Sequence, residues 1–154
     1  VDIVMPDDSR LTIQNSNPDD NTFFVANLSD PESQVVQAEL DQVTNALSSF
    51  QLLDVTNAEN FAGNEPTMHV DYLLKQGVLI RLVAYEVDKD HFMEIEVDQA
   101  APETGIEVSD ATRDYISELQ KMTTGWVFKI PSVSYDSMYK SEPDVLAITE
   151  DQLN

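Results

Sequence analysis

The segment from Gly125 to Pro131 constrains the fold of this chain most. It directly follows a helical pattern, and it alternates bulky apolar residues with Lys129. Pro131 ends it, because proline has no N–H with which to continue a β ladder. The segment therefore predicts a β-strand placed immediately behind a helix. It holds the only tryptophan, Trp126, which we expect to be buried and to anchor the core. Gly125 is expected to end the helix, since glycine tolerates the left-handed conformation after a last turn.

Apolar residues at helical spacing predict two helices. The first runs from about residue 31 to residue 49, and Pro31 suits its first turn. The second runs from Ser109 or Asp110 to about Thr123, and one further helical turn is expected within 135–140. The side chains expected to face the core are Val36, Leu40, Val43 and Leu47 in the first helix and Tyr115, Ile116, Leu119 and Met122 in the second.

Short alternating runs predict strands around these helices. The run 78–87 is apolar on both faces near its centre, which is typical of an interior strand of an antiparallel sheet. The predicted fold is therefore α+β, with antiparallel strands in one sheet or two smaller ones and with two helices packed on a single face. The expected strands cover residues 1–4, 10–14, 22–27, 50–55, 68–75, 78–87, 91–97 and 126–130.

The order of these elements predicts one domain with an internal duplication. Residues 1–146 form the domain, and its two similar halves, about 1–60 and 66–131, each contain a strand-strand-helix-strand unit. Unrelated halves with similar alternation are the alternative, because residue identity between the halves is poor. Residues 147–154 are expected to be an acidic, flexible tail.

The charge of the chain excludes some partners. Its 154 residues include 29 acidic and 8 basic side chains, a net charge of -21. Such a surface repels nucleic-acid phosphates and anionic lipid head groups. It favours divalent or basic partners, or salty surroundings that screen the self-repulsion. With no cysteine, the chain has no disulfide, zinc-thiolate site or cysteine nucleophile. No apolar run approaches the roughly 20 residues that cross a bilayer, and a preceding anchor is expected to have been removed.

No catalytic, cofactor-binding or metal-binding constellation is predicted. His69 alternates with apolar neighbours, and His91 follows a hairpin turn. Either could act as a base beside an aspartate, but structural roles are expected for both. Asp19-Asp20 and the pair Asp88 and Asp90 offer oxygen ligands for calcium, although neither has the spacing of a helix-loop-helix calcium site.

Five segments resemble the bacterial "domain of unknown function 4340" family. The resemblance is strongest in Leu119 to Pro131, followed by Tyr135 to Met138 and Glu142 to Leu146. Upstream, Asp71 to Val78 resembles the family's hairpin, and Leu47 to Val55 resembles its helix end and following strand. The residues that carry the structural signature are Gly125, Trp126, Phe128, Pro131 and Tyr135.

The resemblance implies a non-enzymatic envelope protein. Its relatives are anchored by one N-terminal transmembrane segment and face the periplasm or the outside. They are often linked to ABC-type transport systems, including those similar to gliding-motility proteins. The expected partners are the membrane or ATPase subunits of such a transporter, with no cofactor. Two alternatives stay open: an acidic ligand- or calcium-binding module, and an uncharacterised hydrolase.

Overall fold

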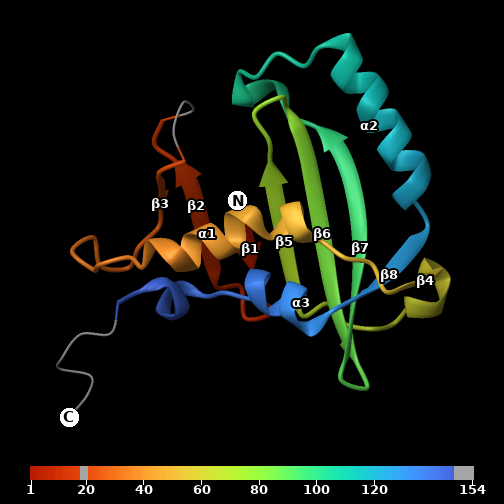
Figure 1. The fold of residues 1–154 in the computed structure, drawn as a ribbon, viewed down its shortest axis with the longest axis horizontal. Helices are drawn as coiled ribbons and strands as arrows, with labels where there is room; N and C mark the ends of the chain where they lie inside the picture. Colours follow the sequence, from red (N-terminus) through yellow and green to blue (C-terminus); the bar gives the residue numbers. More distant parts are fainter. Residues whose placement is uncertain (18–20, 148–154) are drawn as a thin grey trace.

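The computed structural model describes residues 1–17 and 21–147, and it has an α+β fold (Figure 1). Eight strands form one antiparallel sheet in the order β3-β2-β1-β5-β6-β7-β8-β4. The predicted α+β class with antiparallel strands is therefore confirmed. The strands are β1 (Asp2–Val4), β2 (Arg10–Asn15), β3 (Phe23–Val25), β4 (Asp54–Asn57), β5 (Met68–Leu73), β6 (Val78–Val87), β7 (Asp90–Gln99) and β8 (Trp126–Ile130).

Three α-helices occur in the described residues, where two were predicted. They are α1 (Gln37–Asn45), α2 (Asp110–Thr123) and α3 (Ser132–Met138). The Ser109 hydroxyl caps α2 by accepting a hydrogen bond from the Thr112 N–H at 3.1 Å, as expected of an N-cap serine. Short 3-10 helices are η1 (Ala46–Ser49), η2 (Ala58–Phe61), η3 (Pro102–Thr104) and η4 (Glu142–Val145). No helix of this described part is long and apolar enough to span a membrane.

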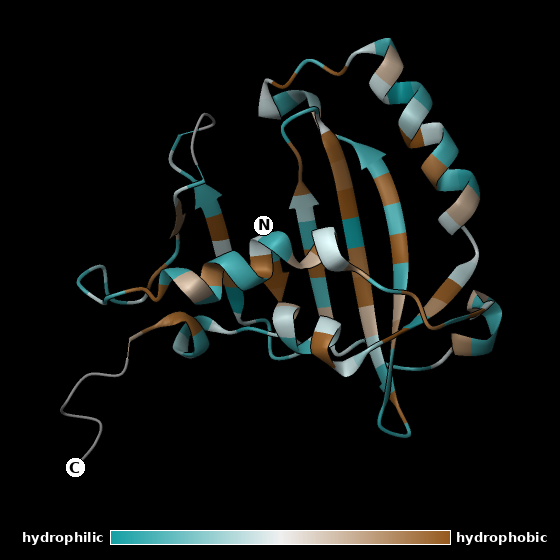
Figure 2. Ribbon diagram, viewed as in Figure 1, coloured by the Kyte–Doolittle hydropathy of each residue, from teal (hydrophilic) through white to brown (hydrophobic). Residues whose placement is uncertain are grey.

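The core lies between the sheet and the helices that cross it. Met68, Ala84 and Met93 are paired neighbours on β5, β6 and β7, so they point to the same face, and all three are fully buried. Leu40 and Val43 of α1 belong to the same cluster. Figure 1 shows α1 and α3 crossing the sheet and α2 at one side. Figure 2 shows hydrophobic and hydrophilic residues alternating along the central strands.

The first helix begins about one and a half turns later than predicted. Val35 forms an isolated antiparallel bridge with Leu146, and the Val36 N–H donates to the Val145 carbonyl at 2.8 Å. These long-range contacts hold the residues before Gln37 in extended conformation, so α1 begins only there. Local spacing could not predict this, because the competing partner lies over 100 residues away.

Two further expectations are wrong in detail. The strand predicted at 50–55 is β4 and covers Asp54–Asn57. In α2, Ile116 is buried as predicted, but Tyr115 is 57% and Met122 62% exposed. The apolar stripe of α2 is therefore narrower than its sequence suggests, because only one side of the helix contacts the sheet.

The expectation that Trp126 is buried is also wrong. Trp126 is 42% exposed, whereas Val127 and Phe128 take the buried positions of β8. The reason is its place in the sheet: Trp126 opens β8 and pairs with Asn57 at the end of the short edge strand β4. Gly125 follows α2 at a φ of 83°, as expected of a residue that ends a helix.

The segment after β8 is more extensively structured than the single turn expected at 135–140. Pro131 precedes α3, whose Tyr135 and Met138 are buried in the main core. Beyond α3, the chain returns to the residues before α1, and the Ala147 N–H donates to the Gln34 carbonyl at 2.8 Å. Apart from Ala147, the predicted acidic tail lies outside the described residues.

Asp144 is expected to make this C-terminal segment sensitive to acid. Partial burial acts to raise the pKa of Asp144, but hydrogen bonds from the Ser141 hydroxyl and N–H outweigh it and hold the pKa below its usual value. A depressed folded-state pKa stabilises the protein above the unfolded-state value, and this contribution is lost as the pH falls through the folded-state value. Asp144→Asn should therefore destabilise the protein at pH 7 by about 0.5–1 kcal/mol, and by less at pH 3.

Urea unfolding at the two pH values measures this difference. Asp136→Asn is the matched control, because it removes the same charge from an exposed position eight residues earlier, in α3. Equal effects of the two substitutions at pH 7 would contradict the role assigned to Asp144.

Candidate functional site

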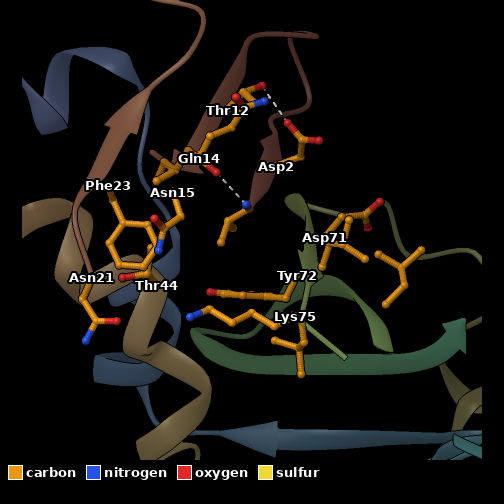
Figure 3. Close-up of a pocket in the computed structure, with 15 residues that line it drawn as sticks. Asp2, Thr12, Gln14, Asn15, Asn21, Phe23, Thr44, Asp71, Tyr72 and Lys75 are labelled. Atoms are coloured by element: carbon orange, nitrogen blue, oxygen red, sulfur yellow. Dashed lines mark hydrogen bonds between the residues drawn. The ribbon is translucent and has the colours of Figure 1, made fainter. Parts of the chain in front are cut away.

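A hollow of about 580 Å³ lies between β2 and β5. Its floor on the helix side includes Phe23, Thr44 and Tyr72, and Figure 3 shows the Tyr72 and Lys75 side chains extending toward Thr44. Tyr72 is 2% exposed, and its hydroxyl donates to the Val43 carbonyl at 2.8 Å. Burial raises the pKa of Tyr72, so this phenol stays neutral at physiological pH.

The opposite side of the hollow is acidic and hydrogen-bonded. The Asp2 carboxylate accepts from the Thr12 hydroxyl at 2.6 Å and lies 2.9 Å from the Arg10 guanidinium. Partial burial acts to raise the pKa of Asp2, but these hydrogen bonds outweigh it and hold the pKa below its usual value. Asp71 lies beside Asp2 on β5 and is 3.7 Å from the Arg81 side chain. Two carboxylate side chains therefore border this side.

A second surface, the far-edge patch, consists of Leu53, Val55 and Trp126. These side chains are 59%, 52% and 42% exposed. The pairing of Val55 with Phe128 places Val55 on the same sheet face as Trp126, two residues earlier on β8. The Val55 N–H donates to the Asp54 carboxylate at 2.8 Å, so this edge donor is already satisfied. Contact with a partner here would therefore use side chains more than strand pairing.

A third group surrounds His91. The Ser132 hydroxyl lies 3.2 Å from His91 Nδ1, and the Glu86 carboxylate lies 3.8 Å from His91 Nε2. The imidazole stacks on Tyr135 with ring centroids 4.1 Å apart, which fixes its plane. Glu86 and Ser132 are exposed, so this group lies at the protein surface. Sequence reasoning singled out His91 alone, because Glu86 and Ser132 come from different elements that only the fold brings together.

The other predicted site residues do not converge. His69 is exposed on β5, and Asp90 forms an ion pair with Lys129 at 2.6 Å. Asp88 has a φ of 53° in the turn between β6 and β7. Asp19 and Asp20 lie outside the described residues. In the part of the chain that is described, no three His, Cys, Asp or Glu side chains gather as metal ligands.

The residues of the expected structural signature divide into two groups. Phe128 and Tyr135 are buried, and Pro131 links β8 to α3. Trp126 and the neighbouring turn residue Gly125 are exposed. The signature therefore contributes both to the core and to the far-edge patch.

Comparison with known proteins identifies no relative of this chain. No family model, curated protein or solved structure gives a significant match to this chain. The resemblance to the "domain of unknown function 4340" family therefore stays a prediction from sequence, and function must be argued from these three surfaces.

Proposed function

We propose that this chain is a non-enzymatic, extracytoplasmic interaction domain of an ABC-type transport system. In this proposal the full-length protein is anchored in the inner membrane, and the domain binds membrane or ATPase subunits of the transporter from the periplasmic side. The family resemblance supplies the cellular setting. The far-edge patch is the observation that carries the interaction role.

The far-edge patch stands out because the rest of the surface is strongly acidic. An ordinary exposed apolar residue needs no explanation, but here Val55 and Trp126 share a sheet face and Leu53 lies two residues before Val55, on a chain with a net charge of -21. Fully burying a large apolar side chain against a partner stabilises a complex by about 1.5–3 kcal/mol. Leu53, Val55 and Trp126 can therefore supply a docking centre, while like-charge repulsion disfavours acidic competitors.

The substitution Val55→Asp tests the docking role. It places a charge at the centre of the far-edge patch, and retention of transporter subunits from detergent-solubilised membranes should fall at least about tenfold. Phe24→Asp is the matched control, because Phe24 is 41% exposed on β3 at the opposite edge of the sheet. Equal retention by both variants, or capture of no transporter subunit by the parent chain, would refute the proposal.

A hydrolase is a second candidate function, favoured by the Ser132–His91–Glu86 group. With a proton on Nε2 facing Glu86, His91 Nδ1 can accept the Ser132 hydroxyl proton as the oxygen attacks an ester carbonyl. The imidazolium then returns this proton to the leaving alcohol, and water releases the acyl group from Ser132 in the second step. The stacked Tyr135 ring would hold the imidazole in place.

A fluorophosphonate probe and p-nitrophenyl acetate hydrolysis test this candidate. If Ser132 is a nucleophile, the probe labels it, and Ser132→Ala and His91→Gln each lower the hydrolysis rate at least about 100-fold. Ser134→Ala is the control, because it removes a hydroxyl two residues later in the same short helix. Absence of labelling, with equal rates for all variants, would eliminate the hydrolase.

We also propose the two finer features of the predicted fold. The element order is three strands, a helix and a strand in each half, which supports the duplication. In contrast, β4 pairs with β8 and not within its own half. The strand register supports the packing of both helices on one face. Val78 and Val97 cluster with Ile116 of α2. By alternation they lie on the same face of the sheet as Ala84 and Met93, which belong to the core cluster of α1.

A further inference from the structure

A pocket of about 350 Å³ lies between the turn that joins β1 to β2 and the segment that follows α3. In Figure 1 this turn lies beside the end of α3. We call this space the Tyr139 pocket. Its walls include Met5, Asp7 and Ser9 from the turn and Tyr139, Ser141 and Asp144 from the later segment. The volume is at the lower end of the range for small-ligand sites, so the pocket suits a single side chain or a small head group.

The Tyr139 ring is held by a stack of rings and is nevertheless exposed. Its centroid lies 5.2 Å from that of Tyr135, one helical turn earlier, and the two ring planes differ by 18°. Tyr135 is itself fixed, because its hydroxyl donates to Thr67 Oγ1 at 3.0 Å and its ring stacks on His91. Tyr139 is 45% exposed and borders the pocket. Tyr135 covers one face of the Tyr139 ring, so the ring is a flat, preformed platform on which a ligand can stack.

Two carboxylates border the same pocket. Hydrogen bonds from the Ser9 hydroxyl and N–H hold the pKa of Asp7 below its usual value, and the pKa of Asp144 is lowered as described above. Both side chains are therefore ionised at neutral pH. In the part of the chain that the structure describes, neither forms an ion pair. Lys140 acts on Asp144 through space, but its ammonium donates to the Glu39 carboxylate at 2.8 Å. The pocket therefore keeps an excess of negative charge.

A guanidinium group fits this combination of ring and carboxylates better than other cations. It is planar, it stacks on aromatic faces, and its N–H groups donate to carboxylates in pairs. An ammonium group is a compact point charge that gains less from a flat ring. A trimethylammonium group is recognised by a cage of several rings, whereas Tyr139 is the one aromatic side chain among the described residues that line the pocket.

We propose that the Tyr139 pocket binds the guanidinium group of an arginine, stacked on Tyr139 and paired with Asp7 and Asp144. The net charge of -21 draws cations of every kind toward the protein, and the ring and the two carboxylates select among them. The pocket shares no residue with the far-edge patch, so the two proposals can fail separately.

Titration with acetyl-arginine methylamide at low salt, followed by amide NMR, tests the proposal. We expect saturable shifts at Tyr139 and Ser141, with half-saturation below about 10 mM. Acetyl-lysine methylamide should bind at least about threefold more weakly, because it lacks the planar fork. Acetyl-citrulline methylamide has the shape of the arginine ligand without its charge and should bind at least about tenfold more weakly.

Free L-arginine distinguishes the two sources of a guanidinium group. Tighter binding of the free amino acid than of the blocked one assigns the pocket to a small molecule. Equal or weaker binding of the free amino acid assigns it to an arginine side chain of a partner protein.

Two substitutions, each with a matched control, place the binding in the pocket. Tyr139→Leu should weaken binding of the arginine ligand about two- to fivefold, whereas Tyr115→Leu, at a ring 57% exposed on α2, should not. Asp7→Asn keeps an oxygen that accepts from the Ser9 N–H but loses the charge, and should weaken binding at least about threefold. Asp8→Asn removes the same charge from the next residue, where asparagine tolerates the φ of 65°, and should have a much smaller effect.

Three results would each overturn the proposal. They are no saturable shift up to about 50 mM ligand, equal binding of the arginine and lysine ligands, and equal losses in Asp7→Asn and Asp8→Asn. Val55→Asp should leave arginine binding unchanged, which separates this result from the test of the far-edge patch.

Discussion

Met138→Ala is expected to lower the free energy of unfolding by about 2–5 kcal/mol, because truncating a fully buried large side chain loses its transfer energy and leaves a cavity. Met138 is 0% exposed and belongs to the same cluster as Leu40 of α1. For a domain of this size, the loss corresponds to a fall in Tm of about 5–20 °C. Differential scanning calorimetry and urea unfolding measure it.

Val133→Ala is the control for Met138→Ala. Val133 lies in the same helix but is 74% exposed, so its truncation should change stability by less than about 0.5 kcal/mol. If the two substitutions had similar effects, α3 would not belong to the core, and the fold described for residues 132–147 would be wrong.

Raising KCl from about 0.05 M to about 2 M is expected to raise Tm by about 10 °C, because screening reduces repulsion between carboxylates. Within the described residues, ion pairs with a carboxylate are made by the side chains of Arg10, Arg81, Arg113, Lys121, Lys129 and Lys140. The chain has 29 acidic side chains and 8 basic ones, so most carboxylates have no cationic side chain to pair with. The pairs themselves weaken with salt, but exposed pairs contribute little to stability.

Sucrose at matched water activity separates screening from general solute exclusion, since a neutral solute cannot screen charge. Most of the rise should occur below about 0.5 M KCl, where the Debye length falls fastest. A Tm that is independent of salt, or that rises equally in sucrose, would show that self-repulsion does not limit the stability of this chain.

The sequence predicts local elements well where short-range patterns decide them. α2 begins and ends where its serine cap and Gly125 place it, and β6 occupies residues 78–87 as predicted. Both are determined by neighbours within a few residues. The start of α1 is different, because it depends on the pairing of Val35 with Leu146, which no local window contains.

Burial at the edge of the sheet is the main failure of the sequence reasoning. A lone tryptophan among alternating apolar residues favours the core, yet Trp126 is exposed because the edge strand β4 is short and its end leaves the indole uncovered. Strand order is not encoded in the pattern of one strand. The signature residues therefore do not all lie in the core: Phe128 and Tyr135 are buried, whereas Trp126 belongs to the far-edge patch.

The candidate sites were largely out of reach of sequence reasoning. Ser132, His91 and Glu86 meet only through the pairing of β7 with β6 and β8. Alternation can predict a strand, but it cannot predict which strands become its neighbours in the sheet.

Site-specific photocrosslinking from position 55 tests the central claim most directly. A photoreactive residue in place of Val55, in the full-length protein in its native membrane, should crosslink to a transporter subunit identified by mass spectrometry. The same residue in place of Phe24, which is similarly exposed at the opposite sheet edge, should not. A transporter adduct from position 55 alone is the predicted result. Equal adducts from both positions, or none from position 55, would contradict the assignment of the far-edge patch as a docking surface.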